Sequence, residues 1–161
     1  DLDLCDFKSV PSEVAELASM SMELISMDSW DEFYSDEKEL QRAKKEQMQK
    51  VLEGLPWIAA IDKFQQWVYT SEHTAEQRRQ EWKNIMSELN SSVIDWEGHE
   101  DALLNLWQKQ LHLYEVPFYY IEYGMAQLGA IAMWRSYKQL GQEALDNYDA
   151  ALKLGYTKSI G

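Results

Sequence analysis

Residues 112–130 read HLYEVPFYYIEYGMAQLGA, with one histidine and four tyrosines around a single proline, followed by a series of small residues. Proline suits the first turn of a helix, because the amide hydrogen that it lacks has no helical partner there. The stretch therefore predicts a helix that begins at Pro117 and runs to about Tyr137. Tyr119 and Tyr123 are four residues apart, so they share one face of this helix. This face either holds a peptide and donates hydrogen bonds to it, or forms a tyrosine-rich edge of the core whose hydroxyls reach water.

The rest of the chain also shows apolar residues at helical spacing. We expect helices over residues 11–25, 36–69, 74–89, 101–111 and 143–154, with a break or kink where Gly54 and Pro56 interrupt the second of them. Thr74 and Gln77 have the spacing of a capping box. No segment alternates apolar and polar residues for long enough to predict a strand. The sequence therefore predicts one all-α unit over residues 1–161.

The composition limits the class of protein. The chain has 161 residues, a formal net charge of −13 and 45% hydrophobic residues, which is enough for a core and argues against disorder. The densest basic segment, residues 42–50, is interspersed with Glu46 and preceded by Glu39, so no face is basic enough to bind a nucleic acid. The acidity and the lack of an apolar run of about 20 residues argue against a membrane partner. The single cysteine, Cys5, excludes a disulfide framework and favours a cytoplasmic location.

Carboxylates lie along one side of the predicted first helix. Glu13, Glu16 and Glu23 are three and then seven residues apart, so they share a side of the helix. A bound cation would favour their ionised forms. A solvated acidic face explains the same pattern, because the helix dipole favours glutamate near the N-terminus. The residues alone leave both interpretations open.

Together, these segments resemble the C-terminal catalytic region of zinc oligopeptidases of the thimet oligopeptidase and oligoendopeptidase F family. The resemblance rests on residues 11–24 and 112–130, on their order and separation in the chain, and on residues 67–70 (WVYT) and Trp82 between them. It extends over nearly the whole chain. It implies an all-α fold that is the helical part of a larger multi-helix metallopeptidase domain, with no substantial sheet.

One motif of that family is missing. The family carries His-Glu-x-x-His, which places two imidazoles on one helical face, whereas the position four residues after His99 is Leu103. The resemblance implies that the motif lies upstream of Asp1. We therefore expect the chain to be a fragment, a nicked product or one chain of a split protein, and to be inactive alone.

The resemblance also implies a metal ligand. A family pattern of Glu, Ser three residues later and Glu seven residues later falls on Glu16, Ser19 and Glu23. Glu16 would be the third ligand of one Zn²⁺ whose two histidine ligands lie outside this chain. Glu23 and Ser19 would contact the metal ligands and not the metal itself, with Glu23 orienting a ligand histidine. Glu13, one turn earlier, is the alternative ligand.

The tyrosine-rich segment takes the other catalytic roles that the resemblance implies. His112, Tyr119 and Tyr123 would stabilise the oxyanion that forms when a peptide carbonyl is attacked, and Tyr120 would contact the substrate. Spacing in this segment varies among members of the family, so Tyr119 and Tyr120 could exchange roles. The implied activity is that of a zinc-dependent endopeptidase. Its partners would be short peptides and the His-Glu-x-x-His portion of the same enzyme, on this chain or a separate one.

A helical interaction scaffold without catalysis is the alternative function. The pattern of a tetratricopeptide-like helix pair is similar to that of Trp134, Tyr148 and residues 150–154. Such repeats recur about every 34 residues and need several copies to bury a continuous core. Residues 41–89 do not reproduce the pattern. A second copy in upstream sequence would favour the scaffold, and a His-Glu-x-x-His motif there would exclude it.

Overall fold

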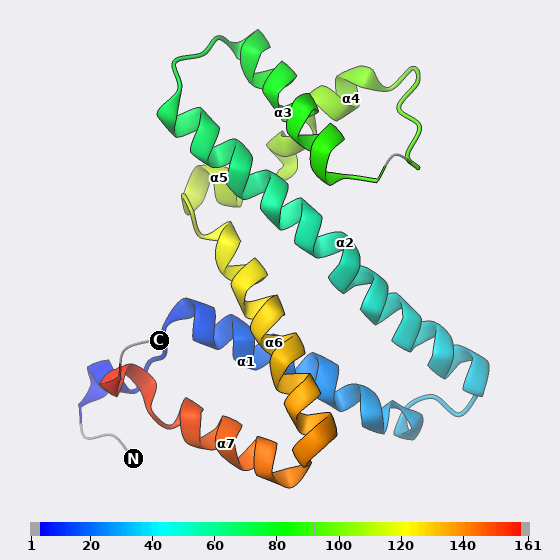
Figure 1. The fold of residues 1–161 in the computed structure, drawn as a ribbon, viewed down its shortest axis with the longest axis vertical. Coiled ribbons are helices and arrows are strands. Elements are labelled where there is room, and N and C mark those ends of the chain that lie inside the picture. The colour runs from blue at the N-terminus through cyan, green and yellow to red at the C-terminus, as the bar shows by residue number, and fades with distance from the viewer. Residues whose placement is uncertain (1–3, 92, 159–161) are drawn as a thin grey trace. The chain divides into compact units, whose positions relative to one another are not determined.

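The computed structural model of the chain describes residues 4–91 and 93–158. This part of the chain is helical and contains no strand, which confirms the predicted all-α fold (Figure 1). The α-helices are α1 (Ser12–Ser26), α2 (Glu37–Thr70), α3 (Ala75–Leu89), α4 (Glu100–Asn105), α5 (His112–Glu115), α6 (Tyr120–Leu140) and α7 (Gln142–Leu152). Short 3-10 helices lie at Cys5–Phe7, Met27–Glu32, Leu106–Lys109 and Gly155–Thr157. Within the described residues, none of the helices is both long and apolar enough to cross a membrane.

The internal contacts divide the chain into two units. The first unit comprises residues 1–49 and 125–161, and the second comprises residues 50–124. The first unit therefore contains α1, α7 and most of α6, whereas the second contains α3, α4, α5 and the C-terminal part of α2.

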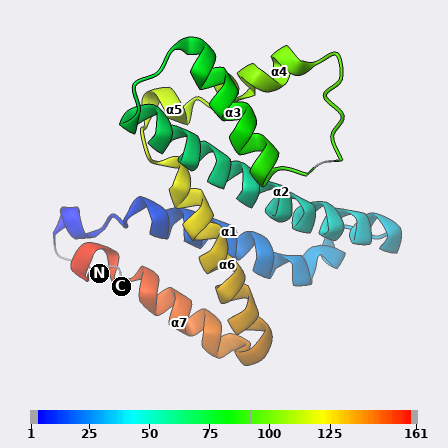
Figure 2. The same cartoon turned by 45° about the horizontal axis from the view of Figure 1, so that its top comes forward.

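In the first unit, α6 crosses α1, and α7 turns back from the end of α6 (Figure 2). The turn between α6 and α7 is at Gly141, whose φ of 59° is favourable only for glycine. The Tyr148 hydroxyl on α7 donates a hydrogen bond of 3.0 Å to the carbonyl oxygen of Ala18 on α1. Lys138 of α6 forms an ion pair with Asp28.

Small residues allow α6 to approach α1 closely. Ala126 and Ala130 are buried, and a Cβ atom added at Gly129 would lie 2.4 Å from Cδ1 of Leu17. Gly54 in α2 provides a control, because a Cβ added there meets no atom within 4 Å.

We expect Gly129→Ala and Gly54→Ala to change stability in opposite directions. Alanine has a higher helix propensity than glycine, so Gly54→Ala is expected to raise the free energy of unfolding by about 0.5–1 kcal/mol. Gly129→Ala forces Leu17 to move and is expected to lower this free energy by about 1 kcal/mol. Urea denaturation followed by circular dichroism measures both. Equal stabilisation by both substitutions would contradict the close crossing of α6 and α1.

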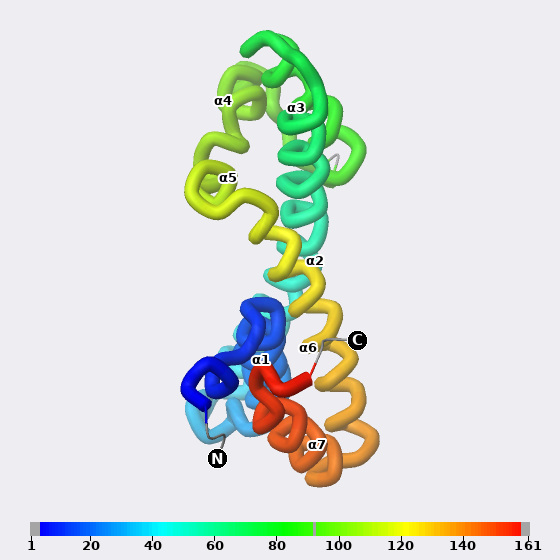
Figure 3. Tube along the Cα trace, turned by 90° about the vertical axis from the view of Figure 1, so that its left-hand side faces the viewer, coloured from blue at the N-terminus to red at the C-terminus, as the bar shows by residue number. Residues whose placement is uncertain are grey.

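The core of the second unit forms where α2, α3 and α4 meet (Figure 3). Its buried residues are Ala60, Ile61, Phe64, Trp82, Ile85, Met86 and Leu103. The indole N–H of Trp82 donates a hydrogen bond of 3.0 Å to the carbonyl oxygen of Leu103, which joins α3 to α4. The Trp82 ring stands edge-on to Phe64 and Trp57, with centroid distances of 5.2 and 5.5 Å. This core fixes the part of α2 that supports the candidate site.

Two helical segments differ from the sequence prediction. α2 continues through Gly54 and Pro56, so the predicted break does not occur, and the kink that was the other expected outcome stays a prediction. Val51 and Ile58, on either side of the proline, are both buried and hold the helix in place. The helix predicted over residues 101–111 instead ends at Asn105 and continues as a 3-10 turn. The Asn105 side chain donates a 2.8 Å hydrogen bond to a backbone carbonyl one turn earlier, which competes with helical hydrogen bonding.

Candidate active site

A tight turn over residues 116–119 precedes α6. The backbone N–H of Tyr119 donates a hydrogen bond of 3.1 Å to the carbonyl oxygen of the first residue of the turn, and Phe118 has a φ of 63°. A proline in second place and a positive φ in third place are typical of a type II turn. The helix therefore begins at Tyr120 and not at Pro117, because a residue in the left-handed conformation cannot continue a right-handed helix. The prediction that Pro117 starts the helix was wrong.

Gln65 of α2 holds this turn in place. Its side chain is 2% exposed, and its Oε1 atom accepts a hydrogen bond of 3.0 Å from the Phe118 backbone N–H. The Phe118 ring packs on Tyr69 with a centroid distance of 5.3 Å. A left-handed conformation costs a bulky residue about 1–3 kcal/mol, which these contacts offset. Gln65 was missed in the sequence, although a polar residue at a buried helical position is a detectable signal.

The turn and the start of α6 place three tyrosine rings around His112. The ring centroids of Tyr119, Tyr120 and Tyr123 lie 6.2, 5.0 and 5.6 Å from that of His112. The Tyr123 hydroxyl lies 3.5 Å from Nε2 of His112. All four side chains are half-buried. The structure thus brings together the four residues for which the family resemblance implies catalytic or substrate contacts, and we call them the His–Tyr cluster.

Gln110 contacts the other nitrogen of His112, and Trp57 in turn contacts Gln110. The side-chain amide nitrogen of Gln110 lies 2.7 Å from Nδ1 of His112. The indole N–H of Trp57, on α2, donates a hydrogen bond of 3.1 Å to Oε1 of Gln110. The ammonium group of Lys109 lies 4.4 Å from the centroid of the Trp57 ring. Nothing in the sequence pattern singled out Trp57 or Gln110, since they are 53 residues apart and meet only in the folded chain.

Burial raises the pKa of the Tyr120 hydroxyl above its ordinary value of 10.0. The nearby indole N–H of Trp57 opposes this increase in pKa, and the neighbouring Tyr123 adds to it. The Tyr120 hydroxyl therefore keeps its proton at neutral pH and remains a hydrogen-bond donor.

The predicted metal-binding residues lie on α1, in the first unit. Glu16 is half-buried, whereas Ser19 and Glu23 are exposed. The Gln47 side-chain amide donates a hydrogen bond of 3.1 Å to Oε2 of Glu23. Within residues 4–91 and 93–158, no three His, Cys, Asp or Glu side chains gather in a way that could hold a metal ion.

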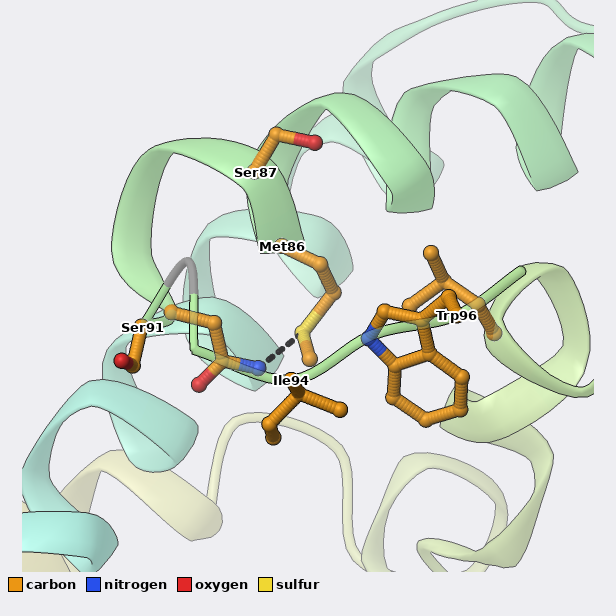
Figure 4. A pocket seen from close by; sticks show the side chains of 7 residues that line it. Met86, Ser87, Ser91, Ile94 and Trp96 are labelled. Atoms are coloured by element: carbon orange, nitrogen blue, oxygen red, sulfur yellow. Dashed lines mark hydrogen bonds between the residues drawn. The ribbon is translucent and has the colours of Figure 1, made fainter. Parts of the chain in front are cut away.

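A cavity of about 220 Å³ also lies in the second unit, at the C-terminal end of α3 (Figure 4). Its lining residues are Met86, Ser87, Asn90, Ser91, Ile94, Trp96 and Leu103. The Asn90 amide contacts the Met86 sulfur at 3.5 Å. None of these side chains is a general acid or base, and none belongs to the His–Tyr cluster. We therefore place the candidate active site at the cluster and not at this cavity.

Comparisons with known proteins identify the family of the chain. The profile described as peptidase family M3 matches residues 5–160. A solved structure described as an oligoendopeptidase F from Bacillus anthracis str. Ames is similar, with a TM-score of 0.74 and 24% sequence identity. The alignment covers 99% of this chain and 25% of that chain, so this chain spans a quarter of the length of that protein. No curated protein matches. Because the family profile extends over almost the whole chain, the chain belongs to peptidase family M3.

Proposed function

We propose that this chain forms part of the active site of a zinc-dependent endopeptidase that cleaves short peptides. The observation that carries the proposal is the His–Tyr cluster, in a chain that belongs to a peptidase family. Family membership favours this function over the helical scaffold considered as the alternative.

The cluster suits the stabilisation of a developing negative charge. Attack on a peptide carbonyl converts its oxygen to an oxyanion, which hydrogen-bond donors in fixed positions stabilise. His112 and Tyr123 face one another at 3.5 Å, so both groups can address one substrate oxygen. Tyr119 is the third candidate for this role and Tyr120 the candidate for substrate contact, with the two roles interchangeable. The Gln65–Phe118 hydrogen bond fixes the turn from which these rings project.

The carboxylate of Glu16 is the ligand that this chain would give to zinc. Carboxylate oxygens are ordinary zinc ligands, and two imidazoles from outside these residues would complete a catalytic site with an open position. A zinc ion held by these residues would activate a water molecule as the nucleophile at neutral pH. Glu23, two turns further along α1, and Ser19 would hold a ligand in its orientation.

The remaining partners follow from this function. Short peptides would be the substrates, and the His-Glu-x-x-His portion of the enzyme would be the structural partner, on the same or a separate chain. Neither a nucleic acid nor a membrane is expected as a partner. A cytoplasmic location is proposed from the single, exposed cysteine.

Cleavage of a quenched fluorescent peptide tests this function. The complete enzyme is expected to cleave it, to lose activity with a chelator and to recover activity when Zn²⁺ is added back. Residues 1–161 alone are expected to show no cleavage under the same conditions. Zinc-dependent cleavage by residues 1–161 alone, or an active complete enzyme that a chelator does not inhibit, would contradict the proposal.

A further inference from the structure

We infer that Trp57 and Gln110 are positioning residues that hold neutral His112 in the tautomer with its proton on Nε2. The inference concerns the hydrogen bonds on the side of His112 opposite Tyr123. The tautomer itself follows from the hydrogen bonds. Only its effect on catalysis rests on the proposed function.

The first step is the orientation of the Gln110 amide. An indole N–H can only donate a hydrogen bond. The Gln110 atom that lies 3.1 Å from Nε1 of Trp57 must therefore be the amide oxygen. A flipped amide would place two donors face to face at that distance. Trp57 thus fixes which end of the Gln110 amide faces His112.

The second step is the proton on His112. With its oxygen bound to Trp57, Gln110 presents its NH₂ group to His112, 2.7 Å from Nδ1. An amide NH₂ group donates, so Nδ1 must accept. In a neutral imidazole one nitrogen accepts and the other carries the proton. The proton therefore lies on Nε2.

The third step is the direction in which this proton points. Nε2 of His112 lies 3.5 Å from the Tyr123 hydroxyl, on the side of the ring where the tyrosines gather. An Nε2–H group there donates toward the oxyanion position of the proposed reaction. The opposite tautomer would present a lone pair to the oxyanion and would repel it. Trp57 and Gln110 thereby determine whether His112 helps or hinders the reaction, although they do not touch the reacting atoms.

Gln110→Glu in the complete enzyme changes the position of the His112 proton while leaving the packing around residue 110 nearly unchanged. The carboxylate has nearly the same shape and still accepts from Trp57, but its second oxygen can only accept, so the proton of the neutral imidazole moves from Nε2 to Nδ1 of His112. We expect kcat to fall about a hundredfold with little change in KM, the effect of losing one oxyanion donor. Trp57→Phe keeps an aromatic ring but removes the N–H group, so Gln110 can flip, and kcat is expected to fall about tenfold. Gln108→Glu adds the same charge at an exposed site and is expected to leave kcat unchanged.

Nitrogen NMR of the complete enzyme labelled with ¹⁵N-histidine reads the tautomer directly, with His112→Asn used to assign the signals. Wild-type His112 is expected to show an unprotonated Nδ1 and a protonated Nε2, and Gln110→Glu to show a protonated Nδ1 and an unprotonated Nε2. A wild-type ring with its proton on Nδ1, or a Gln110→Glu ring like the wild type, overturns the inference. A changed tautomer with unchanged kcat overturns the catalytic consequence. The expected NMR signals in a protein without peptidase activity would uphold the tautomer and refute the proposed function.

Discussion

Replacing Glu16 by glutamine in the complete enzyme is expected to remove its zinc and with it the peptidase activity. A neutral amide oxygen is a much weaker zinc ligand than a carboxylate, and the loss of a direct ligand should exceed the 10–100-fold loss seen for groups that only support a ligand. We therefore expect zinc affinity to fall by more than about a hundredfold. Metal analysis after dialysis against a weak chelator measures this affinity, and circular dichroism checks that the helices remain intact.

Two carboxylates on the same helix serve as controls for Glu16. Glu13 lies nearly one turn earlier on α1, so Glu13→Gln is expected to keep its zinc. Glu23→Gln should weaken zinc binding by about 10–100-fold, as expected for a residue that orients a ligand. Full zinc content in Glu16→Gln would rule out Glu16 as a ligand, and loss of zinc in Glu13→Gln would transfer the role to Glu13.

The second large effect is expected from Tyr123→Phe. The phenylalanine ring preserves the contacts with Tyr119 and Tyr120, whose centroids lie 5.5 and 5.4 Å away, so stability should change little. The hydroxyl beside His112 is lost, and kcat is expected to fall about a hundredfold or more. Steady-state kinetics with the fluorescent peptide measures kcat and KM separately.

Tyr114→Phe is the matched control for Tyr123→Phe. Tyr114 is exposed and stacks on Trp107, with a centroid distance of 6.3 Å, so it lies outside the His–Tyr cluster. Removal of the Tyr114 hydroxyl is expected to leave kcat unchanged. Wild-type kcat in Tyr123→Phe would move the oxyanion role to Tyr119 or Tyr120, and an equal fall in both variants would point to a general effect on folding.

The helices could be predicted from the sequence wherever their causes are local. The capping box at Thr74 is formed in both directions, with hydrogen bonds of 2.8 and 3.2 Å to Gln77. The apolar periodicity after it places Trp82, Ile85 and Met86 in the core. Capping and periodicity depend on residues within a few helical turns, so both can be recognised from a short stretch of sequence.

The errors arise where distant residues decide the local conformation. Pro117 suits both a helix start and the second position of a turn, and the buried Gln65 selects the turn through a hydrogen bond across 53 residues. α2 continues past Pro56 because packing on both sides outweighs the lost backbone hydrogen bond. No pattern within either segment contains this information.

In the candidate site, too, residues that are close in the sequence could be predicted and residues that meet only in the folded chain could not. His112 and the three tyrosines lie within 12 residues of one another in the sequence, and the fold keeps them together. Trp57 and Gln110 could not be identified, because their contact depends on how α2 packs against the segment before α5. The role of Glu16 stays a prediction, since a single carboxylate becomes a metal ligand only beside the others that complete the site.

The most direct test of the proposed zinc-dependent function is an anomalous diffraction map of the complete enzyme at the zinc absorption edge. We expect one peak with a carboxylate oxygen of Glu16 about 2.0–2.2 Å away. A zinc peak without any ligand from residues 1–161, or a fully active enzyme without zinc, would contradict it.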